Sequence, residues 1–416
     1  MTKRVVVTGM GIISPVGNDV TTYWNNLLKG ECGIDFIKSI PTDDLPVRIA
    51  GEVKDFNPAD YNIEPSFSRK QDKFTVYAVA AAWQAMKQSG LSAGDDGNID
   101  PFRLGVYVGA GIGGFSTIVR ENEKLMKEGP RWVSPLFVPT MISNIAAGNI
   151  AIRNKAYGPC LPVVTACATS THAIGEAFRA IKYGHADAII TGGSEAAVIP
   201  IAIAGFANAK ALSRAEDPQY ASLPFNKNRG GFVIAEGAAI LVLEEYEHAK
   251  KRGAEIFAEI CGYGNTCDAH HVTAPRPDGK TQAAAITAAL KEAGYSSDEN
   301  LYINAHGTGT ALNDTSETAA FKLALGEDAY KAHISSTKGA TGHMLGAAGA
   351  AEAIASVLAL KDGVVPPTAH LDEIDPECDL NYTPTDPVKA DITMAISDSL
   401  GFGGHNGCIA FRKYNS

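Results

Sequence analysis

One cysteine of this chain stands where a nucleophile would be placed. Residues 163–170 read Val-Val-Thr-Ala-Cys-Ala-Thr-Ser, so Cys167 lies between a short β-branched run and a stretch with the apolar spacing of a helix. Unpaired amides and the helix dipole at a helix N-terminus favour a thiolate. We therefore expect the pKa of this thiol to fall below the free value of about 8.5. The alternative is that Cys167 is a small buried hydrophobe, and its neighbours alone leave both roles open.

Two histidines lie in matching settings. Residues 304–310 read Asn-Ala-His-Gly-Thr-Gly-Thr, and residues 335–343 read Ser-Ser-Thr-Lys-Gly-Ala-Thr-Gly-His; each motif follows an expected strand. A third glycine-rich motif, Gly-Phe-Gly-Gly-His-Asn, occupies residues 401–406. Glycines at such places permit positive φ and the close approach of a ligand. A single histidine would most often be a packed residue, but His306 and His343 together favour catalysis.

The elements that must position these side chains alternate along the chain. Short β-branched runs that end in glycine alternate with alanine-rich helical stretches, a pattern typical of layered α/β proteins. We expect strands at 4–8, 104–109, 162–166, 187–193, 238–244, 255–263, 301–305, 332–336, 393–398 and 407–412, and helices at 71–89, 115–127, 170–184, 281–293, 315–325 and 346–361.

The chain also contains a weak internal repeat. Residues 231–243 and 401–411 are both glycine-rich loops that run into a strand. They indicate a duplicated unit with a boundary near residue 250. We expect an N-terminal half, 1–250, that carries the nucleophile, and a C-terminal half, 251–416, that carries the two histidines.

Composition limits the function classes. A chain of 416 residues with 45% hydrophobic and 20% charged residues is an ordinary globular protein too long for one core. No apolar run is long enough for a membrane span. The start, Val5-Val6-Val7-Thr8-Gly9, reads as a strand and turn rather than a signal peptide, so we expect a cytoplasmic protein.

Charge and cysteine usage narrow the classes further. The net charge of −10 argues against broad nucleic-acid binding. Seven cysteines, an odd number without a Cys-x-x-Cys pair, argue against a disulfide framework and against a structural zinc site, so no metal is expected.

A glycine-rich loop offers a different class of function. Residues 109–114 match Gly-x-Gly-x-x-Gly after an expected strand, the pattern of a dinucleotide-binding oxidoreductase. That fold also places an acidic residue about 20 positions later, at the end of the next strand. Residues 129–135, Gly-Pro-Arg-Trp-Val-Ser-Pro, contain neither the acid nor a strand. The oxidoreductase is therefore a minor alternative.

Taken together, the motifs resemble a known family. Thr165-Ala166-Cys167, the histidine motif at 306–310, Lys338 with Gly342-His343, and the glycine loop at 401–404 have the order and spacing of the β-ketoacyl-[acyl-carrier-protein] synthases, and are most similar to the synthase II branch. The resemblance spans the whole chain. It implies a duplicated, five-layered α-β-α-β-α thiolase-like fold, a homodimer, and acyl carrier protein as partner. It implies no cofactor beyond the phosphopantetheine that arrives on that carrier.

The resemblance assigns roles in carbon–carbon bond formation. Cys167 would hold an acyl chain as a thioester, and His306 and His343 would stabilise the enolate left when malonyl-carrier protein loses carbon dioxide. Lys338, with Glu352 as its partner, would tune the field around the histidines, although a purely structural ion pair remains an equal alternative. The backbone amides of Cys167 and Phe402 would form the oxyanion hole.

The same resemblance assigns binding roles. Thr273, Thr308 and Thr310 match positions that hold the phosphopantetheine arm, whose amides suit hydroxyl partners. Ile112 and Phe206 match acyl-pocket positions, where the bulk of Ile112 would limit chain length, and Phe402 matches the gate. The expected contacts with carrier protein are Arg69, Lys70 and Arg214; a solvated helix face is the alternative for the first two.

The chain also departs from the family pattern. Where the family usually has Asp, Asp and Gly in the loop before the strand at 238–244, this chain has Asn226, Gly230 and Ala235, and the usual Asn-Ser-Phe is Asp398-Ser399-Leu400. Gly339 replaces a serine and His270 a tyrosine. These changes suggest a divergent paralogue with altered gating. A specialised polyketide-type ketosynthase is one alternative. A non-catalytic chain-length factor is the other, but such a partner lacks the cysteine.

Overall fold

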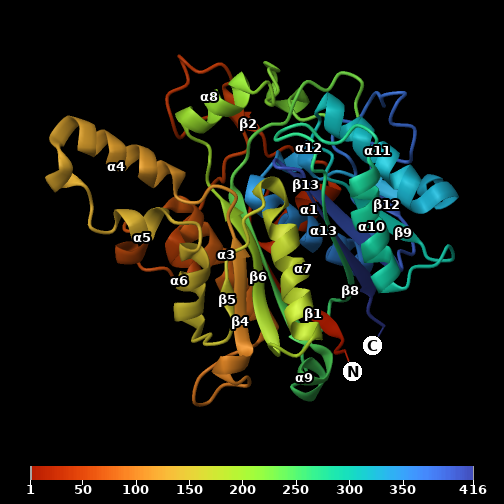
Figure 1. The fold of residues 1–416 in the computed structure, drawn as a ribbon, viewed down its shortest axis with the longest axis horizontal. Coiled ribbons are helices and arrows are strands. Elements are labelled where there is room, and N and C mark those ends of the chain that lie inside the picture. The colour runs from red at the N-terminus through yellow and green to blue at the C-terminus, as the bar shows by residue number, and fades with distance from the viewer. Residues whose placement is uncertain (1, 416) are drawn as a thin grey trace.

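A single strand pattern occurs twice in this protein. The computed structural model describes residues 2–415, and within them a ten-stranded sheet runs in the order β10-β9-β13-β14-β8-β1-β7-β6-β4-β5 (Figure 1). The N-terminal strands are β1 (Val5–Ile13), β4 (Leu104–Gly109), β5 (Cys160–Leu161), β6 (Ala188–Glu195) and β7 (Gly237–Glu245). Their C-terminal counterparts are β8 (Ala258–Cys267), β9 (Leu301–Asn304), β10 (His333–Ser335), β13 (Met394–Gly401) and β14 (His405–Lys413).

The two halves share their pairing directions as well as their order. In each half the first strand pairs antiparallel with the last, and the remaining neighbours pair antiparallel, parallel and parallel. The halves meet where β1 pairs with β8 over Val5–Val7. The weak repeat in the sequence is therefore structural, because its two glycine-rich loops lead into the equivalent strands β7 and β14.

Helices complete five layers. Helices α7 (Thr169–Lys182) and α13 (Ala348–Asp362) lie in the middle and contact strands of both halves. Helices α3 (Lys73–Ser89) and α6 (Ile145–Asn154) cover the outer face of the N-terminal strands. Helices α10 (Lys280–Ala293) and α11 (Ala311–Leu325) cover the C-terminal strands. This is the expected α-β-α-β-α arrangement, in which both central helices are buried between strands.

Paired glycines bring the outer helices onto the sheet. A Cβ atom on Gly9 or Gly11 of β1 would lie only 2.2 or 2.0 Å from a carbonyl oxygen of α3. A Cβ atom on Gly262 or Gly264 of β8 would lie 2.1 or 1.8 Å from a carbonyl oxygen of α10. The expected turn at Gly9 is therefore wrong: the strand continues through both glycines, which are small because a helix backbone touches them.

The strand expected at 162–166 is also wrong. The β4–β5 ladder pairs only Val106 with Cys160 and Tyr107 with Leu161. The next residue, Pro162, has no N–H to donate to the ladder. The chain is therefore free of the sheet before it reaches Cys167, and the other expected strands and helices are present with shifts of a few residues at their ends.

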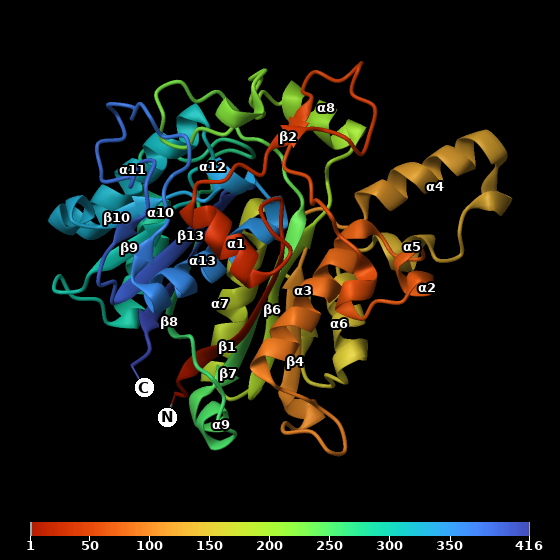
Figure 2. The ribbon, with the colours of Figure 1, turned by 180° about the vertical axis from the view of Figure 1, so that it is seen from behind.

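The remaining elements lie at the edges. Helix α4 (Phe115–Glu128) projects from the N-terminal half, and both termini emerge at one end of the molecule, near α9 (Tyr246–Lys251) (Figure 2). The shorter elements are α1 (Val20–Leu28), α2 (Pro65–Ser68), α5 (Phe137–Met141), α8 (Pro200–Asn208), α12 (Lys338–Thr341), β2 (Asp35–Phe36), β3 (Ile49–Ala50), β11 (Val364–Val365) and β12 (Val388–Lys389). Within residues 2–415, no helix has both the length and the apolar character needed to cross a membrane.

Candidate active site

Cys167 lies in a sharp turn at the start of a central helix. It occupies a short 3-10 turn, Ala166–Ala168, that leads directly into α7. The preceding residue, Ala166, has φ of +50°, a left-handed conformation that a non-glycine residue adopts at a cost of the order of 1–3 kcal/mol. The Thr169 hydroxyl accepts a hydrogen bond from the Thr165 amide at 2.9 Å and fixes the turn. The sequence correctly placed the cysteine at a helix start.

The ionisation of this cysteine differs from the expectation. Burial, with a smaller contribution from the Glu195 carboxylate, raises the pKa of the Cys167 thiol to about 12. The Lys338 ammonium and hydrogen bonds from the Phe402 and Cys167 amides act in the opposite direction but are weaker. The expected low pKa is therefore wrong, because loss of water around the sulfur outweighs the helix start.

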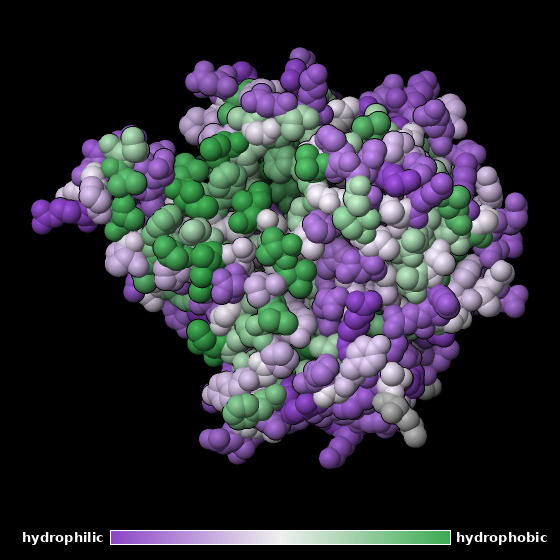
Figure 3. Space-filling view, in the orientation of Figure 1, coloured by the Kyte–Doolittle hydropathy of each residue, from purple (hydrophilic) through white to green (hydrophobic). Residues whose placement is uncertain are grey.

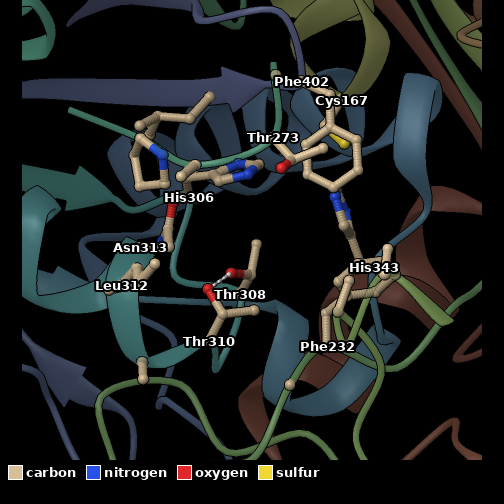
Figure 4. Close-up of a pocket in the computed structure, with 18 of the residues that line it drawn as sticks. Cys167, Phe232, Thr273, His306, Thr308, Thr310, Leu312, Asn313, His343 and Phe402 are labelled. Carbon is tan, nitrogen blue, oxygen red and sulfur yellow. Dashed lines mark hydrogen bonds between the residues drawn. The ribbon is translucent and has the colours of Figure 1, made fainter. Parts of the chain in front are cut away.

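His306 and His343 face the same cavity as Cys167 (Figure 4). His306 follows β9, and its amide donates to Glu317 Oε1 at 2.6 Å. His343 follows α12, and its amide donates to the Val233 carbonyl at 2.7 Å. The two rings lie 5.3 Å apart between centroids and nearly perpendicular, at 86°. Chain segments from both halves therefore bring one thiol and two imidazoles together.

Both imidazoles are neutral. Burial and the nearby Lys338 ammonium hold the pKa of each ring well below its usual range. Within residues 2–415, Nδ1 of each ring is buried without a hydrogen-bond partner. A molecule in the cavity therefore reaches each ring through Nε2. An unpaired buried acceptor is tolerated more readily than an unpaired N–H, so Nε2 is the favoured position of the proton.

Lys338 lies behind the histidines as a fully buried cation. Its ammonium pairs with Glu352 and donates to the His306 carbonyl at 2.5 Å. Its side chain is only 1% exposed. Lys338 does not line the cavity, and its ammonium contacts Glu352 and the backbone of His306.

The cavity that joins these groups has a volume of about 360 Å³. Thr273, Thr308 and Thr310 line it, as their motif positions predicted, and the Thr308 and Thr310 hydroxyls lie 3.2 Å apart. Sequence reasoning missed several lining residues, namely Lys210, Phe232, Asp268 and Asn313. Phe232 carried a signal, the Gly-Gly pair before it, whereas Lys210 and Asn313 stand in no recognisable motif.

Ile112 and Phe206 lie beside this cavity rather than in it. Both pack with Cys167 against one buried apolar cluster that includes Ile203 and Leu345. Phe206 contacts Phe232 edge-on at 5.5 Å and lies 6.3 Å from Phe402. The structure thus places a buried apolar cluster beside Cys167, next to the cavity that the threonines line.

The glycine-rich loop at 109–114 does not bind a dinucleotide. The amides of Gly111, Ile112 and Gly113 already donate to the carboxylate of Glu195, which is fully buried. A loop whose amides are filled by an internal anion has none free for a pyrophosphate. The oxidoreductase alternative is therefore wrong.

Arg69 and Lys70 line a second groove, with Arg120 and Lys124 of α4. Glu121 lies at its base; it is 2% exposed, pairs with Arg120 and Lys124, and accepts a 2.8 Å hydrogen bond from the Ser134 amide. The groove therefore has four cations and one anion. Arg214 lies in the exposed loop after α8 and lines neither the groove nor the cavity.

The departures from the family pattern lie close to the cavity. Gly230 and Leu400 line it, and a Cβ atom on Gly230 would meet nothing within 4 Å, so the missing side chain leaves open space. Asn226 keeps its loop ordered by donating to Asp372 at 2.7 Å. A Cβ atom on Gly339 would lie 2.6 Å from the Ala369 carbonyl, which explains the absence of a serine. Nothing in the structure explains Ala235 or the exposed His270.

Comparisons with known proteins agree with this geometry. The model of the β-ketoacyl synthase N-terminal domain matches residues 2–249, and that of the C-terminal domain matches residues 257–372. A protein from Staphylococcus aureus named 3-oxoacyl-[acyl-carrier-protein] synthase 2 is 49% identical over 414 residues, covering 100% of this chain and 99% of its own. A protein of the same name from Synechocystis is 46% identical over 413 residues, covering 99% of this chain and 98% of its own.

Solved structures agree as well. A β-ketoacyl synthase from Burkholderia phymatum has a TM-score of 0.91 at 34% identity and covers 99% of this chain and 100% of its own. A ketosynthase bound to a hexaketide, in complex with its type II polyketide synthase acyl-carrier protein, has a TM-score of 0.90 at 35% identity, with full coverage of both chains. The chain therefore belongs to the β-ketoacyl-[acyl-carrier-protein] synthase family of condensing acyltransferases and has its thiolase-like fold.

Proposed function

We propose that Cys167 stores the acyl chain during two-carbon elongation of the kind used in type II fatty-acid synthesis. The Cys167 sulfur attacks the thioester of an acyl-carrier protein, the carrier leaves as a free thiol, and the chain remains on Cys167 as an enzyme thioester. The single observation that carries this proposal is one half-buried thiol and two neutral imidazoles around one cavity.

The second step uses the imidazoles. Malonyl-carrier protein loses carbon dioxide, and the electrons of the broken bond form an enolate. The enolate oxygen accepts hydrogen bonds from the ring N–H groups of His306 and His343. The carbanion attacks the thioester carbon, the bond to Cys167 sulfur breaks, and a β-ketoacyl-carrier protein leaves. Preorganised donors of this kind are typically worth a hundred- to a thousand-fold in rate each.

Other residues position the reactants. The Phe402 and Cys167 amides already reach the sulfur, which supports their role as the oxyanion hole for the acyl carbonyl. Gly401 allows this approach, because a Cβ atom there would lie 2.5 Å from the Thr165 carbonyl. Burial is the main reason that the imidazoles are neutral, and the Lys338 charge adds to this effect. The hydroxyls of Thr273, Thr308 and Thr310 suit the amides of a phosphopantetheine arm, which arrives with its carrier, so no cofactor of the enzyme's own is part of the proposal.

The partner in this proposal is acyl carrier protein. The groove of Arg69, Lys70, Arg120 and Lys124 is a local basic site on a chain of net charge −10, and it fits an acidic partner. A ketosynthase solved with its acyl-carrier protein is similar to this chain throughout. Arg214 stays in the proposal only as a more distant contact.

The proposal also covers assembly and location. An apolar face formed by α4, α5, α6 and β5 favours a homodimer (Figure 3). The halves 1–250 and 251–416 are proposed as the structural units, with the nucleophile in one and both histidines in the other. A cytoplasmic location fits the substrates.

A specialised polyketide-type ketosynthase is the second candidate. Gly230 and Leu400 are smaller than the aspartate and phenylalanine usual in the family, and both line the cavity. Extra space there favours a bulkier or more functionalised chain. Elongation assays with saturated acyl-carrier proteins of graded length and with a β-ketoacyl-carrier protein distinguish the two candidates by the preferred donor.

The mechanism is tested by separating its two steps. We expect His306→Ala and His343→Ala to abolish release of carbon dioxide from malonyl-carrier protein while some acyl transfer to Cys167 persists, measured by mass spectrometry of the intact protein. Cys167→Ala should lose acylation but still bind carrier protein. If both histidine variants decarboxylate normally, the enolate assignment is wrong.

A further inference from the structure

A buried carboxylate outside the proposed chemistry lies close to the nucleophile. Glu195, the last residue of β6, is fully buried, and its carboxylate accepts four backbone hydrogen bonds. Gly111 and Gly346 donate to Oε2 at 2.8 and 3.2 Å, and Ile112 and Gly113 donate to Oε1 at 3.1 and 3.3 Å. Each oxygen therefore has two donors, and the carboxylate ties together segments from both halves of the chain.

The packing shows that this site is built around the carboxylate. A Cβ atom on Gly111 would lie 2.7 Å from Glu195 Oε2, and one on Gly346 would lie 2.8 Å from the same oxygen. The Gly111 position is also 3.2 Å from the Ala166 carbonyl, in the turn that carries Cys167. Glycines at these two places let the loop at 109–114, the turn that carries Cys167 and the segment that leads into α13 pack around the Glu195 carboxylate.

Glu195 acts on two functional groups at once. The hydrogen bond from the Ile112 amide to Glu195 holds Ile112 in the apolar cluster that also contains Cys167 and Phe206. Its negative charge opposes that of a Cys167 thiolate, whereas Lys338 of α12 favours the thiolate and both imidazoles are neutral. No other group in the mechanism combines these two effects.

We propose that Glu195 is a positioning residue that anchors the Ile112 loop against the nucleophile turn and restrains the ionisation of Cys167. This inference rests on the proposed role of Cys167 as the nucleophile. Anchoring would set the depth available to an acyl chain, and restraint would keep the thiol from reacting before a substrate is in place.

Alkylation of Cys167 by iodoacetamide, followed by peptide mass spectrometry across pH, tests the charge effect. Glu195→Gln removes the charge at nearly the same size. We expect its alkylation profile to move about one pH unit lower, which makes alkylation at pH 8 about tenfold faster. Glu244→Gln is the matched control, since Glu244 is equally buried but lies beside Arg252 at the far end of β7. An unchanged Glu195→Gln profile, or an equal shift in Glu244→Gln, would overturn the restraint.

Glu195→Asp tests the anchor separately, because it keeps the charge but shortens the side chain by one methylene. We expect its alkylation profile to stay near that of the wild type, while the preferred acyl length in elongation assays shifts by two carbons or more. An unchanged length preference would overturn the anchoring role.

The wild type supplies a measurement that does not depend on a variant folding. Burial raises the pKa of Glu195 to about 7, so Glu195 gains its charge as the pH passes through that value. The logarithm of the alkylation rate should therefore rise with less than unit slope between about pH 6 and 8. A straight line of unit slope would contradict the inference. Alkylation reports on Cys167 whether or not the enzyme condenses, so a failed condensation assay with the expected profiles counts against the proposed function alone.

Discussion

Residues in this site are governed by burial more than by any single neighbour. Cys167 has the helix start that normally favours a thiolate, yet burial raises the pKa of its thiol to about 12. Burial also lowers the pKa of both imidazoles, and there Lys338 acts in the same direction. A sequence indicates which residue types meet at a strand end, but not how much water remains around them. The identity of the three groups was therefore predictable, and their ionisation was not.

The neutral imidazoles make a pH prediction. Their pKa values lie well below 6.5, so neither ring should gain a proton between pH 8 and 6. In Cys167→Ala, where the thiol cannot contribute, decarboxylation of malonyl-carrier protein should change less than about twofold over that range. The measurement is carbon dioxide release, with circular dichroism at each pH as the control for folding. A fall centred near pH 6.5 would show that a ring titrates normally.

Asp398 makes a prediction about stability. Burial raises the pKa of this carboxyl from 3.8 to about 7, with Glu352 adding to the effect. The folded protein therefore holds a proton that the unfolded chain releases, and stability falls as the pH rises from about 4 to 7. Asp398→Asn, the residue usual in the family, removes this loss. We expect its gain in free energy of unfolding over the wild type to grow across that window, reaching a few kcal/mol at pH 8.

Denaturant unfolding at pH 5 and pH 8 measures this difference. Asp391→Asn is a suitable control, because Asp391 lies on the surface, where it pairs with Lys413. A gain for Asp398→Asn that is equal at both pH values would contradict the assignment.

At the scale of elements, the sequence predicted the strands and helices better than it predicted the ionisation of the site residues. Nearly every expected strand and helix exists, because the β-branched runs and alanine-rich stretches follow their periods closely. The failures have local causes: Pro162 ends β5 early, and Gly9 and Gly11 lie inside β1 because α3 packs on them. These contacts between β1 and α3 involve residues 70 or more positions apart, and no local pattern reveals them.

The contact between the two central helices makes a further prediction. Gly349 of α13 faces α7 so closely that a Cβ atom would lie 1.9 Å from the Thr171 hydroxyl. Gly349→Ala should therefore destabilise the protein by about 1–3 kcal/mol or more, through overpacking. Gly205→Ala is the matched control in α8, where a Cβ atom meets nothing within 4 Å, and it should be neutral or stabilising by about 0.4–1 kcal/mol. Chemical denaturation compares the two, and equal effects would refute the close contact.

At the scale of the whole molecule, duplication explains why the reactive groups come from distant parts of the chain. Cys167 enters from the turn before α7 and His343 from the segment before α13, the equivalent helix of the other half. The family resemblance predicted site residues from both halves because it spanned the whole chain. The positions of Ile112, Phe206 and Arg214 relative to the cavity depended on how loops fold back over the sheet, which the motifs did not contain.

The same scale includes a surface that the single chain leaves uncovered. Ten large apolar side chains around α4, α6 and β5 are exposed: Phe102, Leu125, Met126, Trp132, Leu136, Val138, Ile152, Tyr157, Leu161 and Val164. Leu161 and Val164 are 51% and 50% exposed and flank the end of β5, the edge of the sheet. An apolar face on an open sheet edge favours association with a second copy.

Charges on this face should therefore separate the proposed dimer. We expect Leu161→Asp combined with Val164→Asp to shift the mass in solution from about twice 43.7 kDa toward 43.7 kDa, measured by sedimentation equilibrium. Val272→Asp is the control, since Val272 is 71% exposed but lies beside the cavity entrance, between His271 and Thr273. It should leave the mass unchanged. Since Cys167 is only six residues from Leu161 along the chain, separation should also lower the acylation rate. If the wild type sediments as a monomer, the proposed dimer through this face is wrong.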